Sequence, residues 1–456
     1  MLPCHLIKNK TYCYLGMLKT NLMRIKALFI GGAMFLLLGF TGLASGVARE
    51  LPQYLLAIPE VQDIDTLETS DFFSEKYLVL FKQEIDHGNP DAGYFTQRVF
   101  ISHYGFNSPV VYTTEGYTGS YAEMPGYVNE LSAMFEANQI VVEHRYFDQS
   151  VPEPFDWKYL TTANAAADHH AVFEALKPVY KEKWISTGIS KGGETAMLYN
   201  MYYPDDVDIC VAYVGPVAFA VEDGRHEPFI ASVSTGKDRK RILSFQKEVL
   251  KRRSEMIPLL EAFSKKNKLT YRVSIDEVLD YCVLEFSFAF WQWGASPATI
   301  PGTKASTQEL FRYLVMIASP DYFAIEGIEP TLPFFYQAAR ELGYYGYDVK
   351  PFKKYLSISS AEGYLYTIFL PPDLKVDFIP ETSQKLADYM QHKAHHTILI
   401  YGEFDPWSAA AVDVSQNPNV LKVISPAGSH MARIKNLPKI QHDKVINTIT
   451  QWLNEK

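Results

Sequence analysis

The chain has 456 residues, of which 47% are hydrophobic and 21% are charged, a balance that excludes a disordered protein and predicts a globular one large enough for two lobes. Its formal net charge of −9 argues against nucleic acid and anionic membrane surfaces as partners. The 14% of aromatic residues fit either an ordinary core or an aromatic cleft.

The first 48 residues are predicted to be a targeting segment. Basic residues precede an apolar run at 27–40, and small residues follow the run up to Ala48. This order is typical of a secretory signal peptide, so we expect cleavage between Ala44 and Arg49 and an exported mature protein. Met23 is a more natural start, which would make the preceding residues an over-long N-terminus. An uncleaved membrane anchor is the alternative, although the run is short for a spanning helix.

The first part of the mature chain, 49–220, alternates strand and helix patterns. A lead-in over 51–73 is expected to be irregular, and a hairpin with its turn at 86–91 follows it. Strands are predicted at 76–85, 95–102, 109–114, 139–145, 184–187 and 209–214. Helices are predicted at 128–135, 160–176 and 194–203. This alternation predicts a mostly parallel sheet with helices on both faces.

The alternation stops over 221–384, where the pattern is helical and includes the aromatic stretch 286–293. We interpret this segment as a helical cap inserted into the sheet domain. The second part of the sheet domain is predicted at 385–456. Its elements are expected to be strands at 397–401 and 420–425 and an amphipathic helix at 439–453.

The sequence Gly188-Ile189-Ser190-Lys191-Gly192 lies between a predicted strand and a predicted helix. In that context Gly-x-Ser-x-Gly indicates a nucleophile elbow, a strained turn whose small residues expose the serine. The N-terminus of the following helix favours developing negative charge. The motif alone is weak, and an ordinary glycine-rich turn is the alternative. Its context favours Ser190 as a nucleophile.

Two further loops are predicted at the same edge of the sheet. Asp405 follows one predicted strand and His430 follows the next. His430 can accept the serine proton near neutral pH, and Asp405 would fix the imidazole tautomer. The rival acids are Glu403 and Asp413. The order Ser190, Asp405, His430 is that of the α/β-hydrolases, so we predict an α/β protein with the α/β-hydrolase fold and an inserted helical cap domain.

The oxyanion hole is expected to use the backbone N–H of Lys191, the residue after the nucleophile. Its second donor should come from Gly116 or Tyr117, in the loop after strand 109–114. The side chain of Lys191 is expected to be solvated. For the nearby polar run Glu143-His144-Arg145, a structural ion pair is favoured over a catalytic role.

No cofactor and no metal are expected, because no spacing of Cys and His resembles a zinc site. Cys4 and Cys13 lie in the targeting segment, which leaves Cys210 and Cys282. One pair is too few for a disulfide scaffold. Buried free thiols are therefore favoured, and a bridge between the two in an exported protein is the alternative.

With these residues in place, the chain resembles the secreted bacterial tripeptidyl aminopeptidase family of serine peptidases (PS-10 type). It is more distantly similar to the lysosomal Pro-X carboxypeptidase and dipeptidyl peptidase II group. The resembling pieces, in order, are Asp86-His87, Phe95-Thr96-Gln97-Arg98, Glu115-Gly116-Tyr117, Glu143-His144-Arg145-Tyr146, Gly188-Ile189-Ser190-Lys191-Gly192-Gly193, Asp405-Pro406-Trp407 and Gly428-Ser429-His430.

The resemblance implies an exported exopeptidase that removes short peptides, di- or tripeptides, from N-termini, often near proline. The family's nucleophile, acid and base map onto Ser190, Asp405 and His430. The distant group has Tyr-Tyr-Gly after the arginine, where this chain has Tyr146-Phe147-Asp148. That group's specificity is therefore not carried over.

Two other functions remain open. A carboxylester hydrolase could use the same triad, because the triad does not distinguish an amide from an ester. A non-catalytic exported binding protein on a hydrolase scaffold is the other, and the ordered triad argues against it. The expected partners are peptide substrates, without nucleic acid and without stable membrane insertion once the signal is removed.

An exopeptidase must measure distance from the end of its substrate. A carboxylate in a partly dry cleft can bind the cationic α-amino group, and the cap must supply it because the triad occupies the sheet edge. We predict Glu285 for this role, with Trp291 and Trp293 in an aromatic wall beside it. The alternative is that Glu285 is a solvated helix residue and that the aromatic residues are core.

Overall fold

The structure is a computed structural model that describes residues 50–455. The chain divides into two units, Met1–Ala57 and Ile58–Lys456. Helix α3 (Glu50–Leu56) belongs to the first unit, and every other element named below belongs to the second. The predicted signal segment, 1–48, lies outside the described residues. Among the helices of the described residues, none is both long and apolar enough to cross a membrane.

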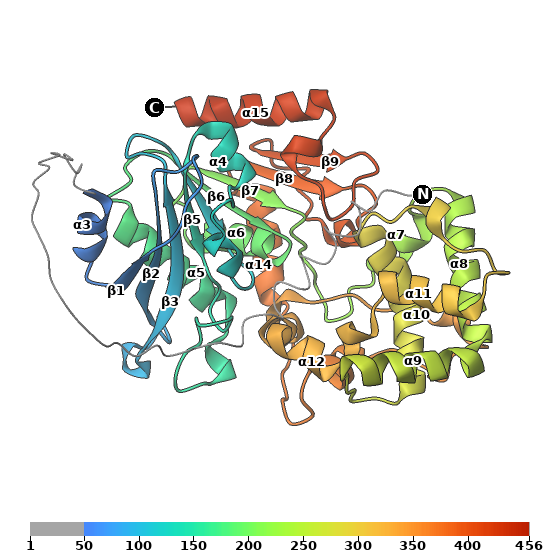
Figure 1. Ribbon diagram of the computed structural model, residues 1–456. Coiled ribbons are helices and arrows are strands. Elements are labelled where there is room, and N and C mark those ends of the chain that lie inside the picture. Colours follow the sequence, from blue (N-terminus) through green and yellow to red (C-terminus); the bar gives the residue numbers. More distant parts are fainter. Residues whose placement is uncertain (1–49, 456) are drawn as a thin grey trace, which may run out of the picture. The chain divides into compact units, whose positions relative to one another are not determined.

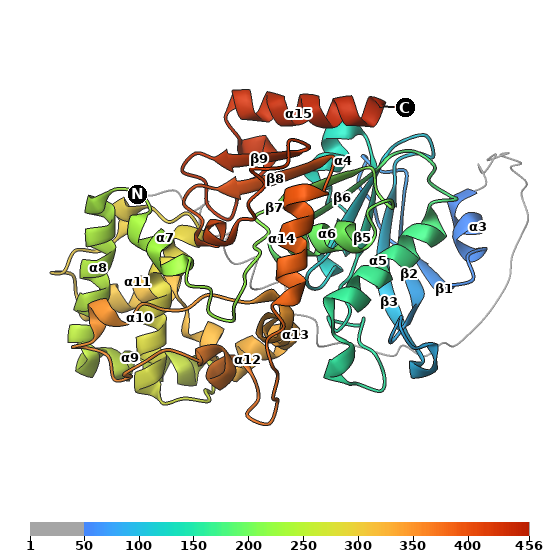
Figure 2. The ribbon, with the colours of Figure 1, turned by 180° about the vertical axis from the view of Figure 1, so that it is seen from behind.

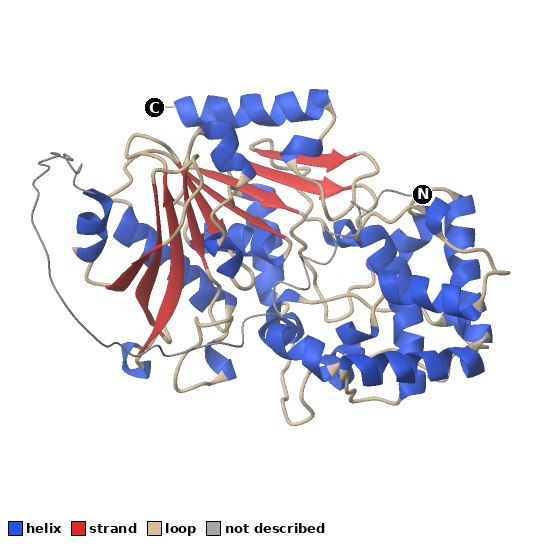
Figure 3. Ribbon diagram, in the orientation of Figure 1, coloured by secondary structure: helices blue, strands red, loops and turns tan. Residues whose placement is uncertain are grey.

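Nine strands of the described residues form one sheet, in the order β1-β2-β3-β5-β4-β6-β7-β8-β9 (Figures 1 and 3). The strands are β1 (Val61–Thr66), β2 (Glu75–Glu84), β3 (Tyr94–His103), β4 (Val110–Thr114), β5 (Asn138–Val142), β6 (Trp184–Ile189), β7 (Ile209–Tyr213), β8 (Thr397–Gly402) and β9 (Val420–Ser425). The pairs from β1 to β5 are antiparallel, and those from β5 to β9 are parallel. The carboxyl ends of β4, β6, β8 and β9 therefore meet at one edge.

Helices cover both faces of the parallel part, whose strands are apolar on both sides. On one face Leu131 of α4 (Glu130–Phe135) and Val445 of α15 (Lys439–Asn454) join the core of the sheet. On the other face Met197 of α6 (Lys191–Tyr202) and Leu386 of α14 (Glu381–His392) do so, and α5 (Thr162–Leu176) packs beside α6 (Figure 2). This arrangement confirms the predicted α/β-hydrolase architecture.

Between β7 and β8 the chain forms the inserted helical cap (Figure 1). Its helices are α7 (His226–Ser232), α8 (Gly236–Lys251), α9 (Arg253–Asn267), α10 (Ile275–Gln292), α11 (Thr307–Ile317), α12 (Ile325–Ile328) and α13 (Leu332–Gln337). Helix α10 begins with a capping box between Ser274 and Glu277 and is buried along most of its length. Its rings, among them Phe286 and Phe290, lie in the cap's own apolar core.

Some local predictions are wrong, and each has a physical reason. The lead-in is not irregular, because it contains α3 and the edge strand β1. Most side chains of β1 are exposed to solvent, so its few apolar residues show no clear alternation in the sequence. The strand predicted at 139–145 ends at Val142, and the polar run after it turns into a loop. Cys210 and Cys282 are both buried free thiols, so they are not bridged.

Candidate active site

Ser190 sits in the turn between β6 and α6, with φ 59° and ψ −122°, a conformation that costs energy in any residue other than glycine. Its N–H donates to the carbonyl of Tyr213 at 2.8 Å, and its carbonyl accepts from Glu194 N at 2.9 Å. A Cβ at Gly188 would lie 2.1 Å from the carbonyl oxygen of Gly192. The glycines are therefore required by the crossing of strand and helix, as the elbow motif predicts.

Asp405 and His430 meet in the loops after β8 and β9. Nδ1 of His430 donates to Oδ2 of Asp405 at 2.7 Å, and both side chains are buried. The other oxygen, Oδ1, accepts from the backbone N–H of Trp407 at 3.2 Å. With its proton on Nδ1, the imidazole presents Nε2 as the base, which is the arrangement that a serine triad requires.

The rival acids do not contact His430. Glu403 accepts from the N–H of Ala427 at 2.6 Å, and Asp413 accepts from the N–H of Ser415 at 2.9 Å. Within the described residues no hydrogen bond joins Ser190 to His430. In enzymes without bound substrate the bond between nucleophile and base is often long, and it tightens when substrate binds.

The loop after β4 lies directly on the first turn of α6. A Cβ at Gly116 would come within 2.7 Å of Lys191 Cβ and of Gly192 N. The Lys191 side chain is not solvated, contrary to expectation: it is 3% exposed, and its Nζ donates to the carbonyl of Gly116 at 2.6 Å. Burial lowers the pKa of Lys191 to about 7, although Glu194 and Glu115 oppose this shift. Nothing in the sequence around the nucleophile motif indicated that the Lys191 side chain is buried.

The polar run after β5 has a structural place. Arg145 forms a two-pronged pair with Asp168, with Nε–Oδ2 at 2.7 Å and Nη2–Oδ1 at 2.6 Å. Its remaining donors reach the carbonyls of Glu84, Ile85 and Tyr159. Glu143 accepts from Ser150 Oγ at 2.8 Å. The sequence analysis did not single out Asp168. Its position among the apolar residues of helix 160–176 could have indicated a buried carboxylate with a partner.

The C-terminal end of α10 touches the histidine loop. The N–H of His430 donates to the carbonyl of Gln292 at 3.0 Å, and the ring of Trp293 lies edge-on to the imidazole at a centroid distance of 6.1 Å. Trp291 is buried, and it lines a hollow of about 390 Å³ together with Phe404 and Ser429. Trp293 therefore lies beside His430, and Trp291 lines a hollow with Ser429, the residue before His430.

Glu285 is buried in the cap, so the alternative of a solvated helix residue is wrong. The other part of that alternative is confirmed, because Phe286, Phe288, Phe290 and Trp291 belong to the apolar core of the cap. Its Oε2 accepts from the hydroxyls of Tyr345 at 2.9 Å and Tyr347 at 2.8 Å. Burial raises its pKa to about 8, against the two hydroxyl hydrogen bonds. Tyr345 stacks on Phe288 and lies 5.3 Å from the ring of Trp407, two residues after Asp405. No lysine, arginine or histidine of residues 50–455 forms an ion pair with Glu285.

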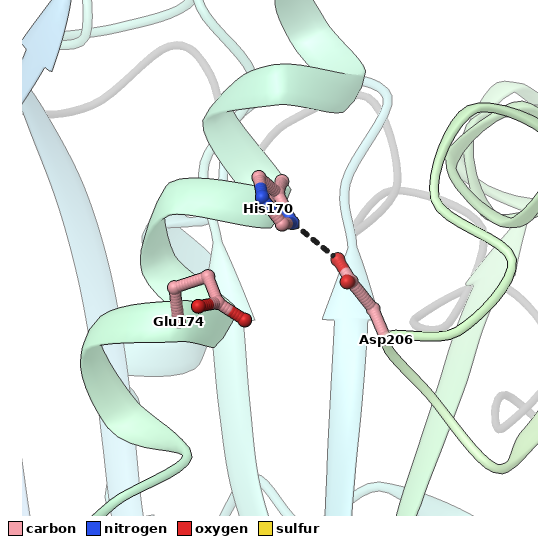
Figure 4. Close-up of side chains that lie close together, drawn as sticks. All are labelled: His170, Glu174 and Asp206. Atoms are coloured by element: carbon pink, nitrogen blue, oxygen red, sulfur yellow. Dashed lines mark hydrogen bonds and ion pairs between the residues drawn. The ribbon is translucent and has the colours of Figure 1, made fainter.

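Among the described residues, one group has the donor types and spacing of a metal site: His170, Glu174 and Asp206 (Figure 4). Its ligand atoms lie within 4.8 Å of one another. Hydrogen bonds within the protein explain this cluster without a metal, because Asp206 Oδ2 accepts from His170 Nδ1 at 2.8 Å and from the hydroxyl of Tyr199 at 2.6 Å. Glu174 is exposed.

The family model described as PS-10 peptidase S37 matches residues 44–455. The chain is 30% identical to a prolyl tri/tetrapeptidyl aminopeptidase of Streptomyces mobaraensis over 441 residues, which cover 92% of this chain and 90% of that protein. It is 29% identical to the lysosomal Pro-X carboxypeptidase of Mus musculus, over 41% of this chain and 42% of that one.

Solved structures give more distant matches. A proline iminopeptidase of Mycobacterium smegmatis has a TM-score of 0.41 and 13% identity, covering 86% of this chain and 99% of that one. The esterase PF2001 of Pyrococcus furiosus has a TM-score of 0.35 and 13% identity, covering 86% and 99%.

Proposed function

The chain belongs to the PS-10 peptidase S37 family and is a serine peptidase, and from that premise we propose that it is an exported exopeptidase that releases short peptides from the N-termini of its substrates. The observation that carries the proposal is the buried pair of Asp405 and His430 at the sheet edge where the strained Ser190 follows β6. That pair provides a base with the correct tautomer for an acyl-transfer reaction.

In the proposed mechanism His430 Nε2 takes the proton of Ser190 Oγ as the oxygen attacks the scissile carbonyl. The N–H groups of Lys191 and of Tyr117, or of Gly116, would hold the oxyanion at the N-terminus of α6. His430 then gives its proton to the leaving amine, and water releases the acyl group by the reverse sequence. Asp405 keeps the imidazole oriented and stabilises its charged form.

We propose that the released peptides end in proline. The Streptomyces relative is named a prolyl tri/tetrapeptidyl aminopeptidase, and the match extends over nine-tenths of both chains. A peptide bond that follows proline needs a site for the pyrrolidine ring. Flat aromatic side chains close to the base, such as Trp293 beside His430, can provide one.

We propose Glu285 as the group that reads the substrate's α-amino group. Glu285 is buried among tyrosines without a cationic partner in the described part of the chain, so its raised pKa keeps it protonated near neutral pH. A bound ammonium would favour the ionised carboxylate, which would release its proton and pair with the ammonium. The aromatic layer of Tyr345 and Trp407 connects it to the loop of the triad acid. The proposed aromatic wall uses Trp291, which lines the hollow together with Ser429, and Trp293, whose ring lies against the imidazole of His430.

The test is mass spectrometry of the products formed from one proline-containing peptide in free and N-acetylated forms. Wild type is expected to release a short N-terminal piece from the free peptide and to leave the acetylated peptide largely intact. Glu285→Gln should lose this preference, whereas Glu261→Gln, at an exposed position on α9, should keep it. Equal cleavage of both peptides by wild type would refute the exopeptidase proposal. If Glu285→Gln retains the preference, another residue reads the amine.

A further inference from the structure

The side chain of Lys191 is buried at the junction of α6 and the loop after β4. Its Nζ donates to the carbonyl of Gly116 at 2.6 Å, and it also lies 5.6 Å from the ring centroid of Tyr117 and 5.3 Å from that of Phe147. These contacts hold the ammonium against one particular peptide unit of the loop. A buried ammonium is costly unless hydrogen bonds replace its lost hydration, and here the Gly116 carbonyl supplies one.

The loop has little freedom to take another position. Gly116 touches the first turn of α6 so closely that no Cβ fits, and a Cβ at Gly192 would lie 3.0 Å from the carbonyl of Thr114. The carbonyl of Tyr117 accepts from His144 N at 3.0 Å, which holds the far side of the same loop. These contacts fix the position of the loop, but they leave the peptide unit between Gly116 and Tyr117 free to rotate.

That peptide unit is trans, so its C=O and its N–H point in opposite directions. The hydrogen bond from Lys191 draws the Gly116 carbonyl oxygen towards the ammonium. It thereby directs the Tyr117 N–H to the opposite side of the loop. A flipped unit would present a carbonyl oxygen where the N–H now points, and an oxygen there would repel a developing oxyanion.

We propose that the side chain of Lys191 is a positioning residue, which fixes the Gly116–Tyr117 peptide so that the Tyr117 N–H serves as the second oxyanion donor. Lys191 would then supply the first oxyanion donor with its backbone N–H and orient the second donor, the Tyr117 N–H, with its side chain. The inference rests on the proposed function, in which Ser190 is the nucleophile.

The surroundings of the ammonium make the positioning sensitive to pH. The titratable and charged groups that face it are Glu115 after β4, Glu194 on α6, His144 after β5 and His169 on α5, and Arg145 acts on the two histidines. Burial raises the pKa of Glu115 to about 7 and lowers the pKa of Lys191 to about 7. As the pH rises above 7, the neutral amine holds the Gly116 carbonyl less strongly, so kcat should decline.

The experiment compares Lys191→Met with Lys76→Met. Lys76 is a matched control, because it is 1% exposed and its Nζ donates to a backbone carbonyl, that of Met124, at 2.7 Å. Each variant loses one buried lysine hydrogen bond and some thermal stability. We expect only Lys191→Met to lose kcat, by about 100-fold, with KM changed by less than about threefold. Its affinity for a peptide aldehyde, which forms an oxyanion on Ser190, should fall by a similar factor.

A second variant covers the case in which Lys191→Met does not fold. Lys191→Arg keeps a donor that stays charged at all working pH values, so it should lack the decline of kcat above pH 7. Wild-type kcat in Lys191→Met, an equal loss in Lys76→Met, or an unchanged decline in Lys191→Arg would each overturn the inference. None of these results would affect the assignment of Ser190, which depends on the loss of activity in Ser190→Ala.

Discussion

Asp405 uses both of its oxygens. One accepts from His430 Nδ1 and the other accepts from the N–H of Trp407, so the carboxylate is held by the same turn that brings it to the base. The ring of Trp407 in turn lies against His226, Phe288 and Tyr345 of the cap region. The position of the acid therefore depends on both the sheet and the cap.

Replacing Asp405 by asparagine should leave a folded protein with kcat lowered by about 10⁴-fold, because an amide nitrogen would favour the wrong tautomer of His430. The measurement is kcat on a proline-containing peptide, with circular dichroism to verify folding. Glu403→Gln and Asp413→Asn serve as controls and should remain close to wild type. A larger loss in either control than in Asp405→Asn would reassign the acid.

Glu285 should make the protein less stable as the pH rises. Its pKa is raised from the usual value near 4.5 to about 8, so between these values the folded state keeps a proton that the unfolded state has lost. The free energy of unfolding therefore falls with rising pH, by at most about 1.4 kcal/mol per pH unit. The Glu285→Gln variant lacks the titratable carboxyl group.

Denaturant unfolding of both proteins at pH 5 and pH 8 measures the effect. The wild type should lose stability relative to Glu285→Gln between the two pH values. A difference that stays constant would show that the carboxyl group is ionised in the folded protein throughout this range.

Among the elements, helix α10 connects the cap to His430, the proposed base. It ends at Gln292, whose carbonyl receives the N–H of His430, and the chain then turns at Gly294. Gly294 has φ +67°, and a Cβ there would lie 3.0 Å from Ser429 Oγ and 3.2 Å from Ser429 Cβ. The turn after α10 therefore needs a glycine for its backbone conformation and for its contact with the histidine loop.

Gly294→Ala should destabilise the protein by about 1 kcal/mol and lower kcat several-fold, because the new methyl group strains the turn and presses on the residue before His430. Gly302→Ala is the matched control, since a Cβ there meets nothing within 4 Å. Thermal unfolding and kcat of the two variants make the comparison. Equal behaviour of both variants would mean that the end of α10 does not position the base.

At the scale of the whole molecule, the parts that were predictable are those with local signals. The alternation of strand and helix patterns predicted the α/β class. The elbow motif and the two strand-end loops predicted the candidate residues Ser190, Asp405 and His430, of which the structure joins Asp405 and His430 by a hydrogen bond. Distant contacts gave no such signal. The burial of Lys191 depends on the loop after β4, 75 residues earlier in the chain. The environment of Glu285 depends on Tyr345 and Tyr347, 60 and 62 residues later.

Export is tested on the mature protein. N-terminal sequencing of the chain secreted by its host should give a start between Ala44 and Arg49, because the small residues there follow a basic and an apolar segment. A chain that retains the segment from Met1 or Met23 would indicate an anchor or a protein that is not exported.

The central claim is that Ser190 is the nucleophile of a serine exopeptidase. The most direct measurement is kcat/KM of Ser190→Ala on a proline-containing peptide with a free N-terminus, alongside wild type, with thermal unfolding to verify that the variant is folded. We expect a folded variant whose kcat/KM is lower by about 10³-fold or more. A folded variant with wild-type turnover would contradict the claim.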